Sequence, residues 1–178
     1  MDSDAILVGC TSRKLSRAAS ARELYDSPLA RWRREYADAQ DKPWFIASAK
    51  YGLLHPDQVV EPYDVRIEDF DLAKRRVWAG RVIAQLEAEL GSLIGRRIEL
   101  HAGGSYRAHL RSALLSRGAD VLMMVHEGDA RGMVSTKRWY DDPGRKWALA
   151  QSARELRRPM TPAEWQAARR AAREIPRG

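Results

Sequence analysis

Cysteine is almost absent from this chain, since Cys10 is the only one in 178 residues. A single cysteine excludes a disulfide framework within the chain and any zinc site built on several cysteines. Long apolar runs are also missing, and none approaches the roughly 18 residues that a membrane-spanning helix needs. The first residues, Met-Asp-Ser-Asp, lack the pattern of a secretory signal peptide. These absences favour a cytoplasmic protein without a membrane anchor.

Positive charge is what the chain has in excess, with 31 Lys and Arg against 24 Asp and Glu and a formal net charge of +7. The excess is clustered. Residues 11–34 hold seven basic and two acidic residues, and residues 141–178 hold nine basic and five acidic ones. A positive surface concentrates polyanions and speeds their capture. We therefore expect a nucleic-acid partner, with an Arg-rich surface that binds no such partner as the alternative.

Short apolar runs of strand length alternate with polar loops and helical patterns. Strands are expected at residues 5–9, 44–48, 97–101 and 119–125, and helices at 20–39 (broken at Pro28), 71–90 and 106–117. This alternation predicts an α/β fold, a three-layer sandwich around a mainly parallel central sheet of about four strands. The predicted division is an α/β domain over residues 1–145 and a basic helical C-terminal extension over 146–178.

In such a sheet the polar loops that follow the strands gather at one edge, where ligands bind. The first of these loops is the Gly-Cys-Thr-Ser-Arg-Lys run at residues 9–14. Its hydroxyls, amides and cations suit an anion, so Ser12, Arg13 and Lys14 are candidate ligand contacts. Cys10 is more typical of a buried, inert thiol than of a nucleophile, because no histidine lies near it in the sequence.

The second loop, at residues 48–64, is the most informative stretch of the chain. It holds Lys50, two tyrosines (Tyr51 and Tyr63) and Asp64 among turn-forming glycine and prolines. Asp64 follows a Pro-Tyr pair, and a stiffened backbone of this kind can hold a catalytic carboxylate. Lys50 is either an amine nucleophile or, more commonly for such a lysine, a phosphate contact. The tyrosines are expected to stack on a base or to donate hydrogen bonds to it.

The third and fourth loops carry weaker signals. The Gly-Gly pair after His101 offers amides that suit a phosphate, but a lone Gly-Gly is not specific. The histidine and carboxylates at residues 126–129 lack the spacing of a metal site, so no metal and no cofactor are expected. The run at residues 135–140 interleaves cations with aromatics, which suits contact with a DNA backbone, and the end of an ordinary surface helix is the alternative.

Several of these motifs resemble an uncharacterised domain family of bacteria and phages. The matching segments are residues 10–14, 23–29, 48–54, 62–64 and 101–106. The Tyr-Gly-Leu-Leu and Pro-Tyr block is also similar to the YaaA peroxide stress protein family, whose members bind DNA. Both groups distantly resemble the uracil-DNA glycosylase type of α/β fold, which includes domains that act on modified bases. The resemblance covers about residues 5–110.

The resemblance implies an enzyme that flips a base, a modified one, out of DNA and cleaves its N-glycosidic bond. Asp64 is then expected to stabilise the oxocarbenium-like transition state, with either water or Lys50 as the nucleophile. Donors to the departing base are expected among Lys50, Ser12 and His101. The residues expected to line the base pocket are Cys10, Tyr51, Gly52, Tyr63 and Tyr106. Those expected to hold DNA phosphates are Arg13, Lys14, Arg107, Lys137 and Arg138.

Two other functions agree with the same sequence. One is a non-enzymatic DNA-binding stress or defence protein of the YaaA type, which needs the charge but no catalytic residue. The other is an enzyme on a modified nucleoside or tRNA base, for which the basic segments are incidental. The resemblance to phage domains further suggests a role in defence against phages with modified genomes.

Overall fold

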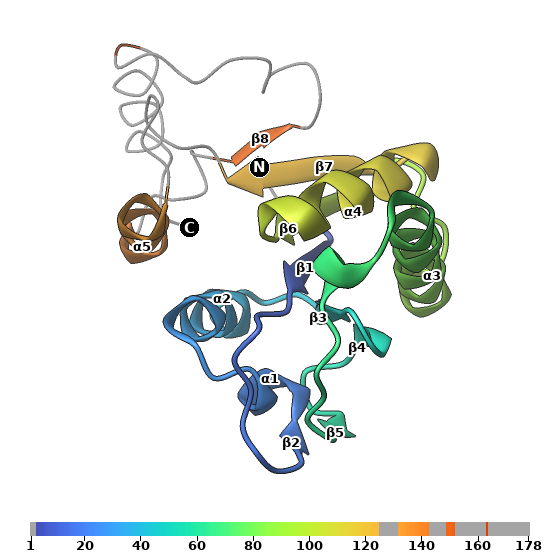
Figure 1. The fold of residues 1–178 in the computed structure, drawn as a ribbon. Coiled ribbons are helices and arrows are strands. Elements are labelled where there is room, and N and C mark those ends of the chain that lie inside the picture. Colours follow the sequence, from blue (N-terminus) through green and yellow to red (C-terminus); the bar gives the residue numbers. More distant parts are fainter. Residues whose placement is uncertain (1–2, 125–131, 143–148, 152–162, 164–178) are drawn as a thin grey trace. The chain divides into compact units, whose positions relative to one another are not determined.

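The computed structural model describes residues 3–124, 132–142, 149–151 and 163. The chain forms two compact units, Asp2–Val121 and Leu122–Gly178 (Figure 1). The division between them falls within strand β7 (Asp120–Met124), and a domain boundary at residue 145 stays a prediction. Most of the predicted C-terminal extension, residues 146–178, lies outside the described residues.

The first unit is built on a sheet with β1 at its centre. Its strands follow the order β4 (Gly52–Leu54), β3 (Trp44–Ser48), β1 (Ala5–Gly9) and β6 (Arg97–His101). β1 pairs in parallel with both β3 and β6, while β4 runs antiparallel to β3. β7 starts next to the start of β6, where the Asp120 N–H donates to the Arg96 carbonyl at 2.8 Å. The predicted, mainly parallel sheet is confirmed.

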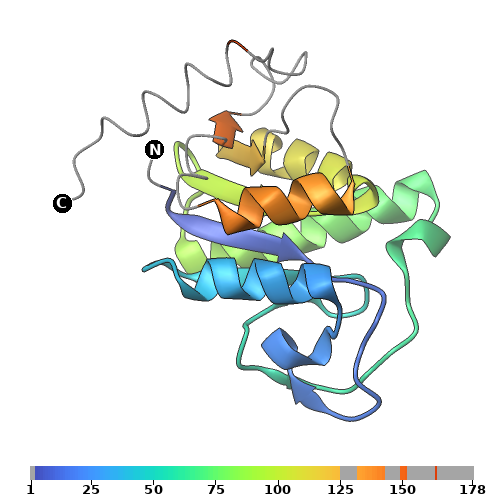
Figure 2. The same ribbon diagram turned by 90° about the vertical axis from the view of Figure 1, so that its left-hand side faces the viewer.

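Helices cover both faces of this sheet, which confirms the three-layer α/β sandwich (Figure 2). Helix α2 (Pro28–Asp38) lies on one face, and α3 (Leu72–Leu90) packs with α4 (Gly104–Ser116) on the other. All five residues of β1 and of β3 are buried as a result. Continuous burial of this kind is why these strands read as unbroken apolar runs rather than as alternating patterns.

The segment between β1 and β3 is more divided than the expected broken helix. It forms α1 (Ala21–Leu24) and then α2, which begins at Pro28 with the Ser27 side chain accepting from the Ala30 N–H at 3.1 Å. Before α1, β2 (Ala19–Ser20) pairs antiparallel with β5 (Val59–Val60). This pairing ties the first polar loop to the second, and strands of two residues are too short to leave a periodic signal in the sequence.

The remaining elements follow the sequence pattern closely. Asp71 caps α3, accepting from the Lys74 N–H at 2.7 Å, after the short 3-10 helix η1 (Ile67–Asp69). In the second unit, α5 spans Met133–Asp141 and β8 (Leu149–Gln151) pairs antiparallel with β7. None of the helices in the described part of the chain has the length and hydropathy to cross a membrane.

One glycine in the second loop is required by local geometry. Gly52 has a φ of +83°, and a Cβ placed there would lie 2.2 Å from Gln85 Oε1. The same oxygen accepts the Leu53 N–H at 2.9 Å, which fixes the turn between β3 and β4 against α3. Gly52, expected in a base pocket, is therefore placed at a turn that packs on a helix.

We predict that Gly52→Ala lowers the free energy of unfolding by about 1–3 kcal/mol, because it combines a left-handed backbone with a steric clash. The matched control is Gly80→Ala on α3, where an added Cβ meets nothing within 4 Å. That change should raise stability by about 1 kcal/mol, as expected for a helix interior. Urea denaturation of both variants tests this. Equal effects of the two substitutions would contradict it.

Candidate functional site

Three tyrosines, a serine and the single cysteine meet at the edge of the sheet where β1 and β3 end. The Tyr63 hydroxyl lies at the centre, 2.7 Å from Ser48 Oγ and 2.9 Å from the Tyr25 hydroxyl. It also lies 3.7 Å from Cys10 Sγ, and the Tyr106 hydroxyl approaches the same sulfur to 3.1 Å. These five residues, Cys10, Tyr25, Ser48, Tyr63 and Tyr106, are called the hydroxyl–thiol cluster below.

Parallel pairing of the strands explains why these residues meet. Cys10 directly follows β1 and Ser48 ends β3, so both lie at the same edge of the sheet. Gly9 allows the segment between β6 and α4 to approach closely, since a Cβ at Gly9 would lie 3.1 Å from the Ala102 Cβ. Trp78 supports the cluster from α3: its Nε1 donates to the Ser48 carbonyl at 2.9 Å, and its ring lies edge-on to Tyr106 at 5.3 Å.

The cluster keeps its tyrosines protonated. Burial raises the pKa of Tyr25, Tyr63 and Tyr106 above the ordinary value for a phenol, and electrostatic repulsion from the neighbouring Cys10 side chain raises each further. The pKa of Tyr106 is also raised by the carboxylate of Glu68 on η1. At neutral pH these phenols therefore carry their protons and can donate hydrogen bonds to a ligand.

Two lysines lie over the rings at the rim of the cluster. Lys14 Nζ is 4.2 Å from the Tyr63 ring centroid, and Lys50 Nζ is 5.8 Å from the same centroid and 4.9 Å from that of Tyr51. The two tyrosine rings meet edge-on at 5.4 Å. Neither lysine pairs with a carboxylate in the described part of the chain, so both cations are available to an anion.

The other predicted residues of the first two loops are exposed. The Asp64 side chain is 93% exposed, with Arg66 Nε at 3.9 Å from its carboxylate. Ser12 is exposed, and its carbonyl accepts from Lys14 Nζ at 3.1 Å. Arg13 is also exposed and forms an ion pair with Asp26 at 3.2 Å.

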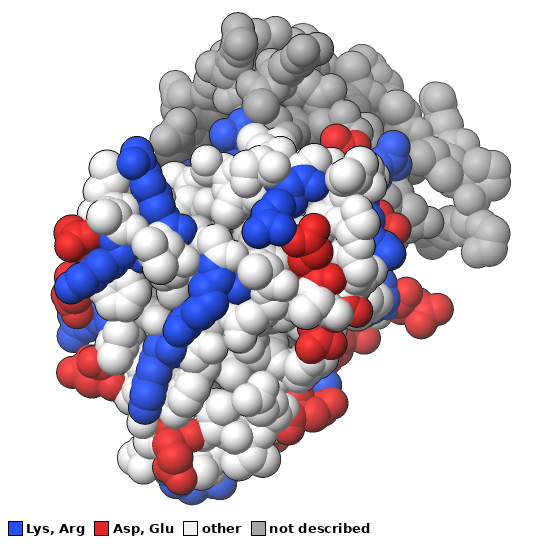
Figure 3. Space-filling model, turned by 90° about the vertical axis from the view of Figure 1, so that its right-hand side faces the viewer, with Lys and Arg blue, Asp and Glu red and all other residues white. Residues whose placement is uncertain are grey.

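The remaining predicted DNA contacts are spread over both units. Arg107 is exposed near the start of α4. Lys137 and Arg138 belong to α5 in the second unit, where Lys137 forms an ion pair with Asp141 one helical turn away. The face in Figure 3, on the side where α3 lies in Figure 1, shows Lys and Arg interspersed with Asp and Glu. The basic excess is therefore not gathered into one uniform patch on that face.

His101, expected as a donor to a departing base, lies in a buried polar network instead. Its side chain is 1% exposed, with Nε2 3.3 Å from Glu99 Oε2 and its ring 4.8 Å from that of Tyr36. Glu99, fully buried on β6, also accepts hydrogen bonds from Tyr36 and Ser3. Lys42 Nζ lies 3.6 Å from the same carboxylate. The network holds β6, α2 and the start of the chain together, and it encloses the histidine.

Burial by itself raises the pKa of Glu99, but hydrogen bonds from His101, Ser3 and Tyr36 outweigh it. The net result lowers the pKa of Glu99 from 4.5 to about 2. The carboxylate is thus ionised and compensated inside the protein at any pH above that value.

Some site residues were not singled out by the sequence analysis. Tyr25 lies in a stretch that reads as a helix, Ser48 reads as the end of a strand, and Glu68 lies on a single 3-10 turn. Its position at the end of a strand is the one signal that marks Ser48, since Cys10 directly follows β1 at the same edge of the sheet. No group of three or more metal-binding side chains exists among the residues that the structure describes.

A protein-family model matches the chain over residues 5–140. The chain belongs to a family of unknown function, DUF6884. The match includes the hydroxyl–thiol cluster and both rim lysines. Comparison with curated proteins and with solved structures found no match.

We predict that acid destabilises the protein through Glu99. Because the folded-state pKa is lowered, its stabilising effect is complete above about pH 4.5 and is lost as pH falls towards 2. The loss amounts to roughly 3 kcal/mol. Glu99→Gln should remove this part of the pH dependence, while Glu35→Gln, at an exposed position on α2, should leave it unchanged. Urea denaturation between pH 2 and 7 measures the free energy of unfolding at each pH. Parallel plots of this free energy against pH for wild type and Glu99→Gln would contradict the prediction.

Proposed function

We propose that this protein binds DNA at the hydroxyl–thiol cluster. There it cleaves the N-glycosidic bond of a modified base that is flipped out of the helix. The observation that carries the proposal is the position of Lys14 and Lys50 over the Tyr51 and Tyr63 rings, since neither lysine pairs with a carboxylate among the residues that the structure describes. Cations beside aromatic faces are suited to a nucleotide, because the phosphate binds the cations and the base stacks on a ring. The lysines lie at the carboxyl ends of parallel strands, where ligands bind in folds of this class.

The tyrosine protons support the chemical step of the proposal. When the bond between C1′ and the base nitrogen breaks, its electron pair leaves with the base, and negative charge develops on the base. Neutral hydroxyls in a buried site can stabilise such charge by hydrogen bonding. Tyr63 and Tyr106, whose pKa values are raised by burial, can serve as these donors. Water then adds to C1′, and the proton that it loses neutralises the base anion, which gives an abasic site and a free base.

The positive charge that develops on the sugar calls for a carboxylate, and we assign this role to Asp64. It directly follows Tyr63, whose hydroxyl is anchored in the cluster, so its backbone is well positioned. The carboxylate is exposed, and a bound nucleotide would cover it and strengthen its electrostatic effect. Glu68 is the second candidate, because its charge reaches Tyr106 in the same cluster.

A purely DNA-binding protein is the second function that we propose to test. It is favoured by one observation: the hydroxyl–thiol cluster contains no carboxylate, while the rim lysines alone suffice to hold phosphates. An enzyme on a free modified nucleoside agrees less well with these lysines, since it needs no backbone contacts.

We predict that Asp64→Asn lowers base release at least 100-fold while DNA affinity stays within a few-fold, because an amide cannot stabilise a cationic sugar. Base release is measured by mass spectrometry after incubation with unmodified and phage-modified DNA. The matched control is Glu61→Gln in the same loop, which should keep full activity. Loss of activity in Glu68→Gln but not in Asp64→Asn would move the carboxylate role to Glu68. If no base is released from any of the DNAs while DNA binding is intact, the glycosylase is excluded and the purely DNA-binding function remains.

We further predict that Lys14→Gln and Lys50→Gln each weaken DNA binding and reduce its salt dependence. Each lysine that contacts a phosphate contributes about 0.9 to the slope of log K against log salt on duplex DNA. The double variant should therefore lose nearly 2 from this slope. Fluorescence anisotropy between 50 and 300 mM salt measures it, and Lys74→Gln, on the exposed side of α3, is the control. An unchanged slope in the double variant would contradict the assignment.

A further inference from the structure

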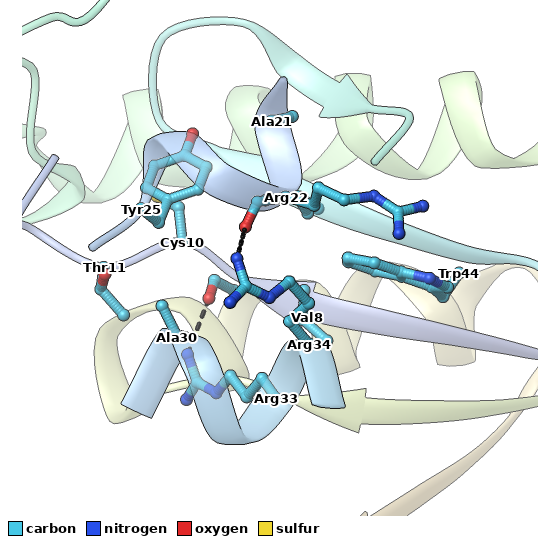
Figure 4. A pocket seen from close by; sticks show the side chains of 12 residues that line it. Val8, Cys10, Thr11, Ala21, Arg22, Tyr25, Ala30, Arg33, Arg34 and Trp44 are labelled. Carbon is cyan, nitrogen blue, oxygen red and sulfur yellow. Dashed lines mark hydrogen bonds between the residues drawn. The ribbon is translucent and has the colours of Figure 1, made fainter. Parts of the chain in front are cut away.

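A pocket adjoins the hydroxyl–thiol cluster on the side of α1 and α2 (Figure 4). The space in and around it is about 280 Å³ when the open solvent at its mouth is counted. Cys10 and Tyr25 line it and also belong to the cluster, so the two sites are continuous. Arg33 and Arg34 of α2 line it from the other side, and neither was expected at a site from the sequence.

Arg33 is buried without a charge partner. The residue is 6% exposed, and its Nη1 donates to the Gly9 carbonyl at 2.7 Å. Its Nε is buried with no hydrogen-bond partner, and no carboxylate pairs with it among the residues that the structure describes. A buried guanidinium in this state is unfavourable unless an anion compensates it.

Arg34 adds a second uncompensated charge to the same pocket. Its Nη1 donates to the Arg22 carbonyl at 3.1 Å, as Figure 4 shows, and it forms no ion pair within the described ranges. Arg22 differs from both, because it pairs with Asp38 at 3.2 Å and with Asp57 at 2.9 Å. Among the residues that line the pocket, Arg33 and Arg34 therefore bring positive charge that no carboxylate in the described ranges balances.

We infer that this pocket binds a terminal phosphate group of a nucleotide or oligonucleotide through Arg33 and Arg34. Thr11 supplies a further donor: its Oγ1 accepts from Ser27 Oγ at 3.1 Å, which leaves its own proton for the ligand. The nature of the ligand rests on the proposed nucleic-acid function, since the base is placed at the neighbouring cluster. The pocket can bind a phosphate whether or not the protein cleaves a glycosidic bond.

The enclosure of the pocket favours a terminal phosphate over an internal one. An internal phosphodiester has chain on both sides and cannot bring its oxygens to an arginine that is 6% exposed. A terminal phosphate enters end-on, and its charge of about −1.5 to −2 at neutral pH matches two guanidinium groups. Arginine also suits phosphate geometrically, because its planar donors form paired hydrogen bonds.

The test compares oligonucleotides of one sequence that carry a 5′-phosphate, a 3′-phosphate or no terminal phosphate, in fluorescence anisotropy with the full chain. We expect one of the phosphorylated forms to bind at least 10-fold more tightly than the unphosphorylated form. Arg34→Met should reduce this ratio to below 3, with little effect on the unphosphorylated form. Arg33→Lys should reduce it as well, and circular dichroism checks that both variants are folded. Arg31→Met, an exposed arginine on the same helix, removes the same charge and should keep the ratio.

A ratio near one in the wild type, or equal losses in Arg34→Met and Arg31→Met, would overturn the inference. Competition identifies the source of the phosphate: a nucleoside monophosphate should displace the oligonucleotide at 100-fold lower concentration than inorganic phosphate. Equal displacement by inorganic phosphate would overturn the nucleotide assignment. Because these are binding measurements, phosphate-dependent affinity without base release would contradict the glycosylase and leave this inference standing. Base release with equal affinity for phosphorylated and unphosphorylated oligonucleotides would support the glycosylase and overturn the phosphate pocket.

Discussion

The parallel pairing of β1 with β3 and β6 decides where the polar side chains of this protein meet. Three strands that run in the same direction bring three chain exits to one edge. Cys10 and Ser48 occupy two of these exits, and α4, which follows the third, supplies Tyr106. The β2–β5 pair then ties the first loop to the second, so that Tyr63 reaches both strand ends. Every contact in the proposed site depends on this arrangement.

Two buried charges, on Glu99 and Arg33, differ in how well the surrounding residues compensate them. Glu99 is buried with hydrogen-bond donors and a lysine around it, and the hydrogen bonds that stabilise its carboxylate lower its pKa. Arg33 is buried almost as deeply, yet it has one carbonyl partner and an unpaired Nε. The first arrangement is typical of a structural element, because nothing is left for a ligand to supply. The second leaves a role for an anion, and it lies beside the tyrosines that we propose bind a base.

The strands and long helices could be predicted because burial on both faces leaves continuous apolar runs and Asp71 and Gly91 mark the ends of α3. The site could be predicted only in part. Cys10, Tyr63 and Tyr106 stand out as polar residues after strands or in a motif, whereas Tyr25 and Arg33 lie in stretches that read as ordinary helix. Their role comes from long-range packing, which a linear pattern does not record. His101 shows the opposite case, since a histidine after a strand suggests chemistry but is enclosed by Glu99 and Tyr36.

We infer that a base of bound DNA lies against the tyrosines at the edge of the sheet. Photo-crosslinking with DNA that contains 5-iodo-2′-deoxyuridine tests it most directly, because this base couples to aromatic side chains that it contacts. Mass spectrometry of the crosslinked peptides then locates the contact. We expect adducts on Tyr51 or Tyr63, which disappear when Lys14 and Lys50 are both changed to Gln. Adducts confined to other segments, with none in residues 48–64, would contradict it.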